Sequence, residues 1–257
     1  APKSLYNFTH MITLRRILRA IGLTLLPVAL NATAAQPQRD YATVSAKAER
    51  FFKYQEWANA AAMYEIMMED SAHVAGTYSS AIAVAGMRQL PDYQMSVFER
   101  SQKNLVPMTK VLDGVREVSF SLGKASLYEN FLQLLLKRHP WLGRSIDKQL
   151  LDYYIFRRDG KGIVDMSRIM LSTAPGNTSY LNSLADGLIL QGKYDEAVNA
   201  YRQTLAMDPD NMTALLALGN YLLISEQPDE ALPYLRRANA IAPSPYIAEL
   251  ISQCDKQ

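Results

Sequence analysis

The chain has 257 residues, 49% of them hydrophobic, and its 27 basic and 25 acidic residues give a formal net charge of +2. This composition is typical of a folded domain, and the charge balance gives no electrostatic footprint for nucleic acid. Three histidines and one cysteine, none within ligand spacing of another, argue against a zinc or haem site and exclude an internal disulfide. We therefore expect no cofactor.

The N-terminal segment, residues 1–39, contains no aspartate or glutamate. Arg15, Arg16 and Arg19 precede an apolar run over residues 20–30, and small residues follow it up to Ala35. A basic start, a short apolar core and a small-residue exit form the order of a secretory signal peptide. The run is about 11 residues long, which is too short to span a bilayer.

We predict a signal peptide over residues 1–35, in which residues 1–10 form an extension upstream of Met11, and a mature domain over residues 36–257. Cleavage would follow Ala35 or the residue before it. The predicted location is the periplasm or cell envelope of a bacterium. A mitochondrial transit segment and an ordinary structured helix are the alternatives, because the segment bears arginines and no acids.

The chain downstream of this segment is repetitive, with a period of about 34 residues. Pro175, Pro209 and Pro243 keep this period without deviation, and Pro107 and Pro140 extend the series upstream with slightly uneven spacing. Such self-similarity indicates one supersecondary unit used repeatedly, and the length of the repeating region predicts about six units.

The residue pattern is clearest in two adjacent units. Residues 184–188 and 192–197 of one unit correspond to residues 218–222 and 228–231 of the next, with small residues where helices approach and large ones between them. These stretches resemble the tetratricopeptide repeat, and residues 48–67 reproduce the same pattern near the start. The second, third and fourth units are degenerate. The resemblance implies an all-α fold, a right-handed α-solenoid of about six helix-turn-helix repeats.

Residues 246–254 carry Ile247, Leu250 and Ile251 at helical spacing. An open last face of a repeat stack needs a cover, so this segment is predicted to be a C-terminal capping helix. Cys254, at its end, is interpreted as a small apolar residue of that helix rather than a reactive thiol.

In proteins of the tetratricopeptide repeat family the first helix of each pair lines a concave groove, so the resemblance implies a protein-binding surface. A clamp for a partner's C-terminal carboxylate is compatible with Asn220, but Asp186 would repel that carboxylate. The remaining groove positions are mostly apolar, which suits an extended segment or a helix. The candidate groove residues are Asn182, Asp186, Ile189, Leu190, Thr213, Leu216, Asn220, Leu223 and Ile224, with Ser45, Glu49, Phe52 and Lys53 at the matching positions of the first unit.

A second candidate surface is the mixture of basic and aromatic side chains within residues 137–161. Acidic residues interrupt this window, and the two interpretations are solvated helix ends or a patch for an acidic partner or a membrane surface. The residues assigned to it are Lys137, Arg138, Trp141, Arg144, Tyr153, Tyr154, Arg157 and Arg158.

No catalytic motif is present: the chain has no glycine-rich phosphate loop, nucleophile elbow or His-Glu-x-x-His pair. We predict no enzymatic activity and nominate no catalytic or metal-binding residue. The leading interpretation is a scaffold or adaptor that holds a protein partner in an envelope complex, with membrane association only through that partner or an uncleaved N-terminus. A solenoid that binds a small ligand or glycan, in a pocket lined by Trp141 or tyrosines, and a divergent enzyme are the alternatives.

Overall fold

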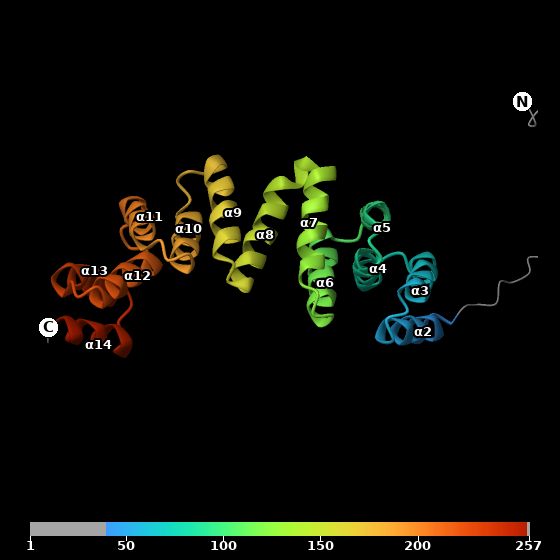
Figure 1. The fold of residues 1–257 in the computed structure, drawn as a ribbon, viewed down its shortest axis with the longest axis horizontal. Coiled ribbons are helices and arrows are strands. Elements are labelled where there is room, and N and C mark those ends of the chain that lie inside the picture. The colour runs from blue at the N-terminus through green and yellow to red at the C-terminus, as the bar shows by residue number, and fades with distance from the viewer. Residues whose placement is uncertain (1–39, 256–257) are drawn as a thin grey trace, which may run out of the picture. The chain divides into compact units, whose positions relative to one another are not determined.

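The computed structural model describes residues 40–255, and all regular structure in that range is helical, with no strand. The predicted signal peptide and its boundary at residue 35 lie outside the described residues. Figure 1 shows the helices in chain order. Their bounds are α2 Tyr41–Lys53, α3 Trp57–Asp70, α4 Ala75–Met87, α5 Pro91–Lys103, α6 Met108–Ser121, α7 Ser126–Arg138, the 3-10 turn η1 Pro140–Leu142, α8 Gly143–Arg157, α9 Gly160–Thr173, α10 Thr178–Leu190, α11 Tyr194–Met207, α12 Met212–Ile224, α13 Pro228–Ile241 and α14 Pro245–Cys254.

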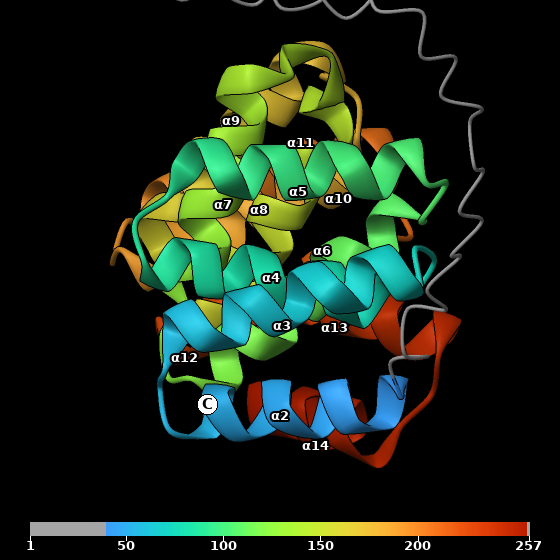
Figure 2. The same cartoon turned by 90° about the vertical axis from the view of Figure 1, so that its right-hand side faces the viewer.

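The described helices form six helix-turn-helix pairs, from α2/α3 to α12/α13, followed by the single helix α14. Residues 1–44 and residues 45–257 are separate compact units, and the structure describes only residues 40–44 of the first. Within the second unit, successive helices pack on one another, as α3, α4 and α5 do in Figure 2. The predicted all-α repeat solenoid of about six units with a C-terminal capping helix is confirmed.

The first helix of every pair ends in the same backbone turn. A residue one or two positions after the helix end has a positive φ, between 52° and 73°, and these residues recur at about the period of the repeat. In the last pair Glu226 N donates to the Leu223 carbonyl and Gln227 N donates to the Leu222 carbonyl, the two bonds of a Schellman motif. Each of the six turns makes the same two bonds. The positive-φ residues are Gln55, Gln89, Gly123, Arg158, Gly192 and Glu226.

The second helix of a pair usually ends in a different way. His139, Ala174, Asp208 and Ala242 adopt φ values between −131° and −140° with ψ between 69° and 89°, and each directly precedes a proline. Proline excludes the helical conformation from the residue before it, so these prolines explain both the helix ends and the period in the sequence.

The junction between the second and third pairs departs from this rule. There α5 ends in a Schellman turn with Leu105 at a φ of 59°, and Pro107 lies directly before α6. Pro107 therefore begins a helix rather than following the end of one. Pro107 and Pro140 thus occupy different structural positions, so the 33 residues between them do not measure the repeat period.

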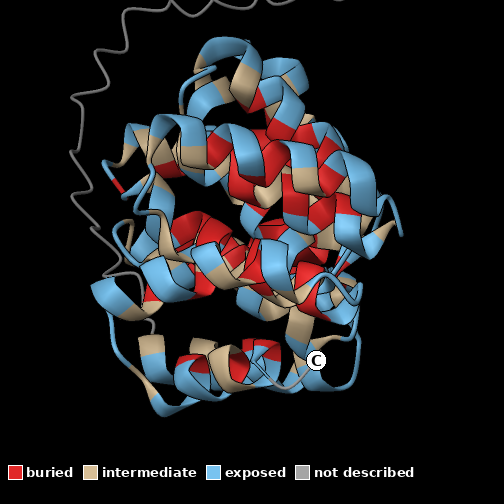
Figure 3. Ribbon diagram, turned by 90° about the vertical axis from the view of Figure 1, so that its left-hand side faces the viewer, coloured by how far each residue is buried: buried red, intermediate tan, exposed pale blue. Residues whose placement is uncertain are grey.

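The core is continuous along the stack and has no single centre. Buried side chains lie on helix faces that turn toward neighbouring helices, and the outer faces are exposed (Figure 3). Small residues allow the closest approaches: a side chain at Gly219 would collide with the buried Leu235 of the paired helix. The sequence pattern of small and large positions is thus a packing pattern.

Helix α14 closes the last pair. Ser244 caps its first turn by accepting a hydrogen bond from Ile247 N at 3.2 Å. Leu250 and the free thiol Cys254 are buried against Leu223 and its neighbours on α12 and α13. Cys254 is therefore a buried packing residue, as predicted.

Replacing Gln89 with glycine is expected to stabilise the protein by about 1 kcal/mol. The left-handed conformation costs a residue with a side chain roughly 1–2 kcal/mol, and glycine removes this cost. The greater conformational entropy of glycine in the unfolded chain offsets part of the gain. Gln89 is exposed and holds a φ of 56°. Urea unfolding followed by circular dichroism measures the change. Gln89→Ala is the control, and equal stabilisation by alanine would show that φ is not the cause.

Candidate functional site

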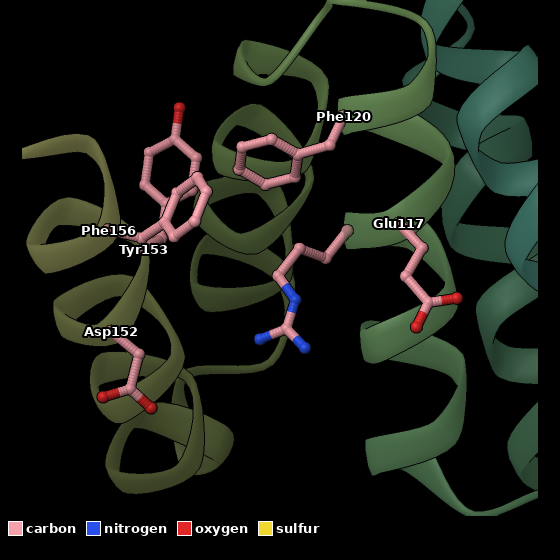
Figure 4. Close-up of a pocket in the computed structure, with 6 residues that line it drawn as sticks. Glu117, Phe120, Asp152, Tyr153 and Phe156 are labelled. Carbon is pink, nitrogen blue, oxygen red and sulfur yellow. The ribbon is translucent and has the colours of Figure 1, made fainter.

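The first helices of the third and fourth pairs border a cleft of about 400 Å³. Figure 4 shows that side chains from α6 and α8 project into the space between the two helices. First helices are those assigned to the binding groove on the sequence, so this cleft is part of that face. Its lining residues are Arg116, Glu117 and Phe120 from α6 and Asp152, Tyr153 and Phe156 from α8.

The wall of this cleft is aromatic. The rings of Phe120 and Phe156 meet edge to face, with centroids 5.1 Å apart and an interplanar angle of 84°. Phe120 also lies 6.2 Å from the ring of Tyr153, which is buried. Phe156 itself is 72% exposed. Such edge-to-face contacts hold rings in a defined orientation, so Phe156 presents a fixed apolar surface to solvent.

Helix α7 supports this wall from behind. The fully buried ring of Tyr128 lies 5.9 Å from that of Tyr153, and its hydroxyl donates to Gln149 Oε1 at 2.9 Å. Tyr154 donates to Glu129 Oε1 at 2.8 Å. Burial raises the pKa of Tyr128 to about 12. The aromatic wall is therefore anchored on two helices.

The charged groups stand at the rim of the cleft. Arg116 pairs with Asp113 one helical turn earlier, at 3.2 Å, while Glu117 and Asp152 are exposed. An apolar floor with a polar rim is the arrangement of a surface that buries an apolar side chain of a partner. Across residues 40–255 no group of histidine, cysteine and acidic residues could hold a metal ion.

The structure divides the predicted groove residues of α10 and α12 into accessible and inaccessible ones. Asp186, Ile189, Leu190, Thr213 and Ile224 are exposed, and Leu216 and Asn220 are partly exposed. Asn182 is buried and donates to Asn211 Oδ1 at 2.9 Å, and Leu223 is buried beneath α14. Neither of these two side chains is open to a partner.

Two further polar groove residues are held by neighbours within the solenoid. Asp186 accepts a hydrogen bond from the hydroxyl of Tyr201, and Asn220 Oδ1 accepts one from Tyr246 at 3.3 Å. Among the matching residues of the first pair, Glu49 and Lys53 are exposed, and Phe52 packs edge to face on Trp57 at 5.5 Å.

An apolar residue is exposed at the same repeat position in three successive units. Phe156, Leu190 and Ile224 are each one repeat period apart, lie at the ends of α8, α10 and α12, and are 72%, 39% and 82% exposed. The repeat pattern in the sequence predicts Leu190 and Ile224 as groove residues but not Phe156, because the fourth unit is degenerate. Counting one period back from Leu190 would have found it.

The second predicted surface is not one patch. Trp141 lies in η1 and Arg144 at the start of α8, whereas Arg157 and Arg158 lie at the other end of α8, about 21 Å away for a helix of 15 residues. Lys137 is exposed at the end of α7, and Arg138 pairs with Asp92 at 2.5 Å. Tyr153 and Tyr154 face α7 instead of solvent. The structure therefore does not bring the eight residues together.

Residues 183–244, the fifth and sixth pairs, match the family model described as tetratricopeptide repeat. No curated protein sequence matches the chain. Similar solved structures include the APC/C hetero-tetramer Cut9–Hcn1 (13% identity, TM-score 0.44, 86% of this chain and 44% of that chain). Another is the TPR2AB domain of yeast Sti1 in a pHSP90 complex (14% identity, TM-score 0.38, 84% of this chain and 98% of that chain). A third is PilF of Pseudomonas aeruginosa (13% identity, TM-score 0.44, 82% of this chain and 96% of that chain).

The chain spans less than half the length of the first of these structures. The likenesses concern the fold alone. The match to the tetratricopeptide repeat model is confined to residues 183–244, the two units where the residue pattern is clearest. Within the described residues, no helix combines the length and the hydropathy needed to cross a bilayer.

Tyr128 is expected to make stability depend on alkaline pH. Its pKa is raised from 10.0 to about 12, so the fold favours the neutral phenol. The raised pKa contributes up to about 2.7 kcal/mol to the free energy of unfolding. This contribution is fully present below pH 10 and is lost as the pH rises from 10 through 12. Urea unfolding at a series of pH values should show a shallower loss for Tyr128→Phe than for the wild type. The expectation would be contradicted if Tyr128→Phe and the wild type lost stability with pH to the same extent. It would also be contradicted if the control Tyr54→Phe, at an exposed ring, showed the same shallower loss.

Proposed function

We propose that this protein is a non-enzymatic scaffold or adaptor that binds a segment of a partner protein along its first helices. The observation that carries the proposal is the exposed apolar set Phe156, Leu190 and Ile224, at one repeat position in three consecutive units. A contiguous group of exposed apolar residues on a folded protein marks an interaction site more often than a single exposed apolar residue does. Stacked helix pairs present such rows on an extended surface.

The contacts between units support a continuous surface. Gln191 donates its side-chain amide to the carbonyl of Gly160 at 2.8 Å, and a side chain at Gly160 would collide with Leu190. This packing holds the end of α10 against the turn that follows Phe156. In the next unit Tyr194 stacks on Tyr221 at 6.0 Å, one turn before Ile224. The apolar positions are thus joined by packed side chains from one unit to the next.

A partner for this surface presents several apolar side chains in a row. The polar groups nearby, such as Asp186 and Asn220, are already hydrogen-bonded inside the solenoid, so they offer little for a terminal carboxylate. An extended segment or one face of an amphipathic helix fits better. This argument supports binding by side-chain burial rather than by a carboxylate clamp.

The proposal includes export to the periplasm or cell envelope, with the partner part of an envelope complex. Its support is the order of residues 15–35 alone: arginines, a short apolar run and small residues. Removing residues 1–35 removes four of the 27 basic residues and none of the 25 acidic ones, which leaves a formal charge of −2.

Replacing Phe156, Leu190 and Ile224 together with serine is expected to reduce partner capture at least tenfold, because central apolar contacts carry most of the energy of an interface. The measurement is affinity purification from the native source with quantitative mass spectrometry. The matched control replaces Met207 and Ile241, which are exposed at the ends of the second helices α11 and α13. Equal loss in both variants, or none in the first, would overturn the proposed surface. Circular dichroism verifies that both variants are folded.

Intact-mass analysis of the purified native protein tests export. The expected product begins at Ala35 or Gln36, and replacing Ala32, Thr33, Ala34 and Ala35 together with bulky residues should block cleavage at both positions. A product that retains Arg15 to Leu30 would contradict cleavage and favour a retained N-terminal segment.

One observation favours binding of a small ligand as a second function. The structure contains clefts lined by Tyr153, by Trp141 and by Tyr180, and the largest of these measures about 550 Å³. Such volumes lie within the range of ligand sites. Protein capture that survives the serine substitutions, together with ligand binding lost in Phe156→Ser, would favour this alternative.

A further inference from the structure

A second cleft, of about 320 Å³, lies away from the first helices' apolar row. It is formed by the last turns of α5, the start of α6 and the 3-10 turn η1. Phe98, Met108 and Leu142 supply its apolar surface. Glu99 and Gln102 supply its polar groups. Neither the repeat pattern nor the proposed function accounts for this combination.

One wall of the cleft is an exposed tryptophan. Trp141 is 75% exposed, and its ring meets the ring of His139 edge to face, with centroids 4.7 Å apart. His139 in turn lies 6.3 Å from the buried ring of Phe98. The indole is therefore supported by two further rings while much of its surface remains open to solvent. Indole gives the strongest cation–π attraction among the aromatic side chains.

The charge in the cleft is negative. Glu99 Oε1 lies 3.3 Å from His139 Nε2, but the ring nitrogens of His139 make no hydrogen bond within residues 40–255. This contact leaves the Glu99 side chain 59% exposed, so its carboxylate can also accept hydrogen bonds from a ligand. The amide nitrogen of Gln102 donates to Ser101 Oγ at 3.0 Å and to the Val106 carbonyl at 3.4 Å, and its amide oxygen is a further potential acceptor among the lining residues. Arg138, next in sequence to His139, is already paired with Asp92.

We infer that this cleft binds a guanidinium group, stacked on Trp141 and hydrogen-bonded to Glu99. A guanidinium is planar, is weakly hydrated for a cation, stacks on aromatic faces and has five N–H donors that match a carboxylate. The Glu99 carboxylate would repel an anionic group, so an acidic partner does not fit this cleft. The same chemistry is supplied by an arginine side chain of a protein or by a free guanidinium compound. The inference does not depend on the proposed groove.

The test uses the intrinsic fluorescence of Trp141. The chain has two tryptophans, and Trp57 lies on α3, so Trp57→Phe in the full chain leaves Trp141 as the only one. The probes are arginine amide and its neutral isostere citrulline amide. Arginine amide is expected to give a saturable change in emission, and citrulline amide at the same concentration is expected to give none. Calorimetric titration of the wild type makes the same comparison without the Trp57 substitution.

Two carboxamide variants locate the site. Glu99→Gln is expected to weaken binding of arginine amide about tenfold, because the charged acceptor is lost. Glu117→Gln, which removes an exposed carboxylate of the other cleft, is the matched control and should bind normally. Equal binding of citrulline amide, no saturation by arginine amide, or unchanged affinity in Glu99→Gln overturns the inference.

A short peptide with one internal arginine distinguishes the two sources. Binding of this peptide as tight as that of arginine amide supports an arginine of a protein partner. Binding of the free amide alone supports a small guanidinium compound. Binding of neither overturns the site.

Discussion

The backbone reversal after each first helix is the constraint on which the rest of the structure depends. Its two hydrogen bonds return the chain against the helix it has just left, so every unit becomes a pair with one apolar side. A single pair cannot bury that side alone, and burial is completed only by the next pair. The six turns share this geometry although just two of them, at Gly123 and Gly192, have glycine at the positive-φ position.

The same turn also sets which residues are left exposed. Leu223 and Ile224 are consecutive on α12, yet the first is buried and the second is 82% exposed, because one lies beneath α14 and the other is the last residue before the reversal. Ile189, which matches Leu223 one unit earlier, is exposed. The exposure of a residue near the end of a first helix therefore differs between units at the same repeat position.

The two clefts differ in what they can bind because different helices supply their charges. In the first, Phe156 and Phe120 form an apolar wall and the charged groups stay at the rim, which favours burial of an apolar side chain. In the second, Glu99 lies within reach of the ring that supports Trp141, which favours a cation. The window of residues 137–161 was a candidate for one basic surface in the sequence, but α8 places its two halves at opposite ends, and Trp141 lines a cleft together with Glu99 of α5.

The period, the six helix pairs, the capping helix and the ends of most second helices could be predicted from the amino-acid sequence. These features follow from local rules: apolar spacing within a helix, small residues at close approaches, and prolines that exclude the helical conformation from His139, Ala174, Asp208 and Ala242. Only the tertiary structure decided that Asn182 and Leu223 are buried, that Phe156 completes the apolar row, and that Glu99 joins Trp141. Exposure and proximity depend on side chains that the neighbouring units contribute, and no pattern within one repeat contains that information.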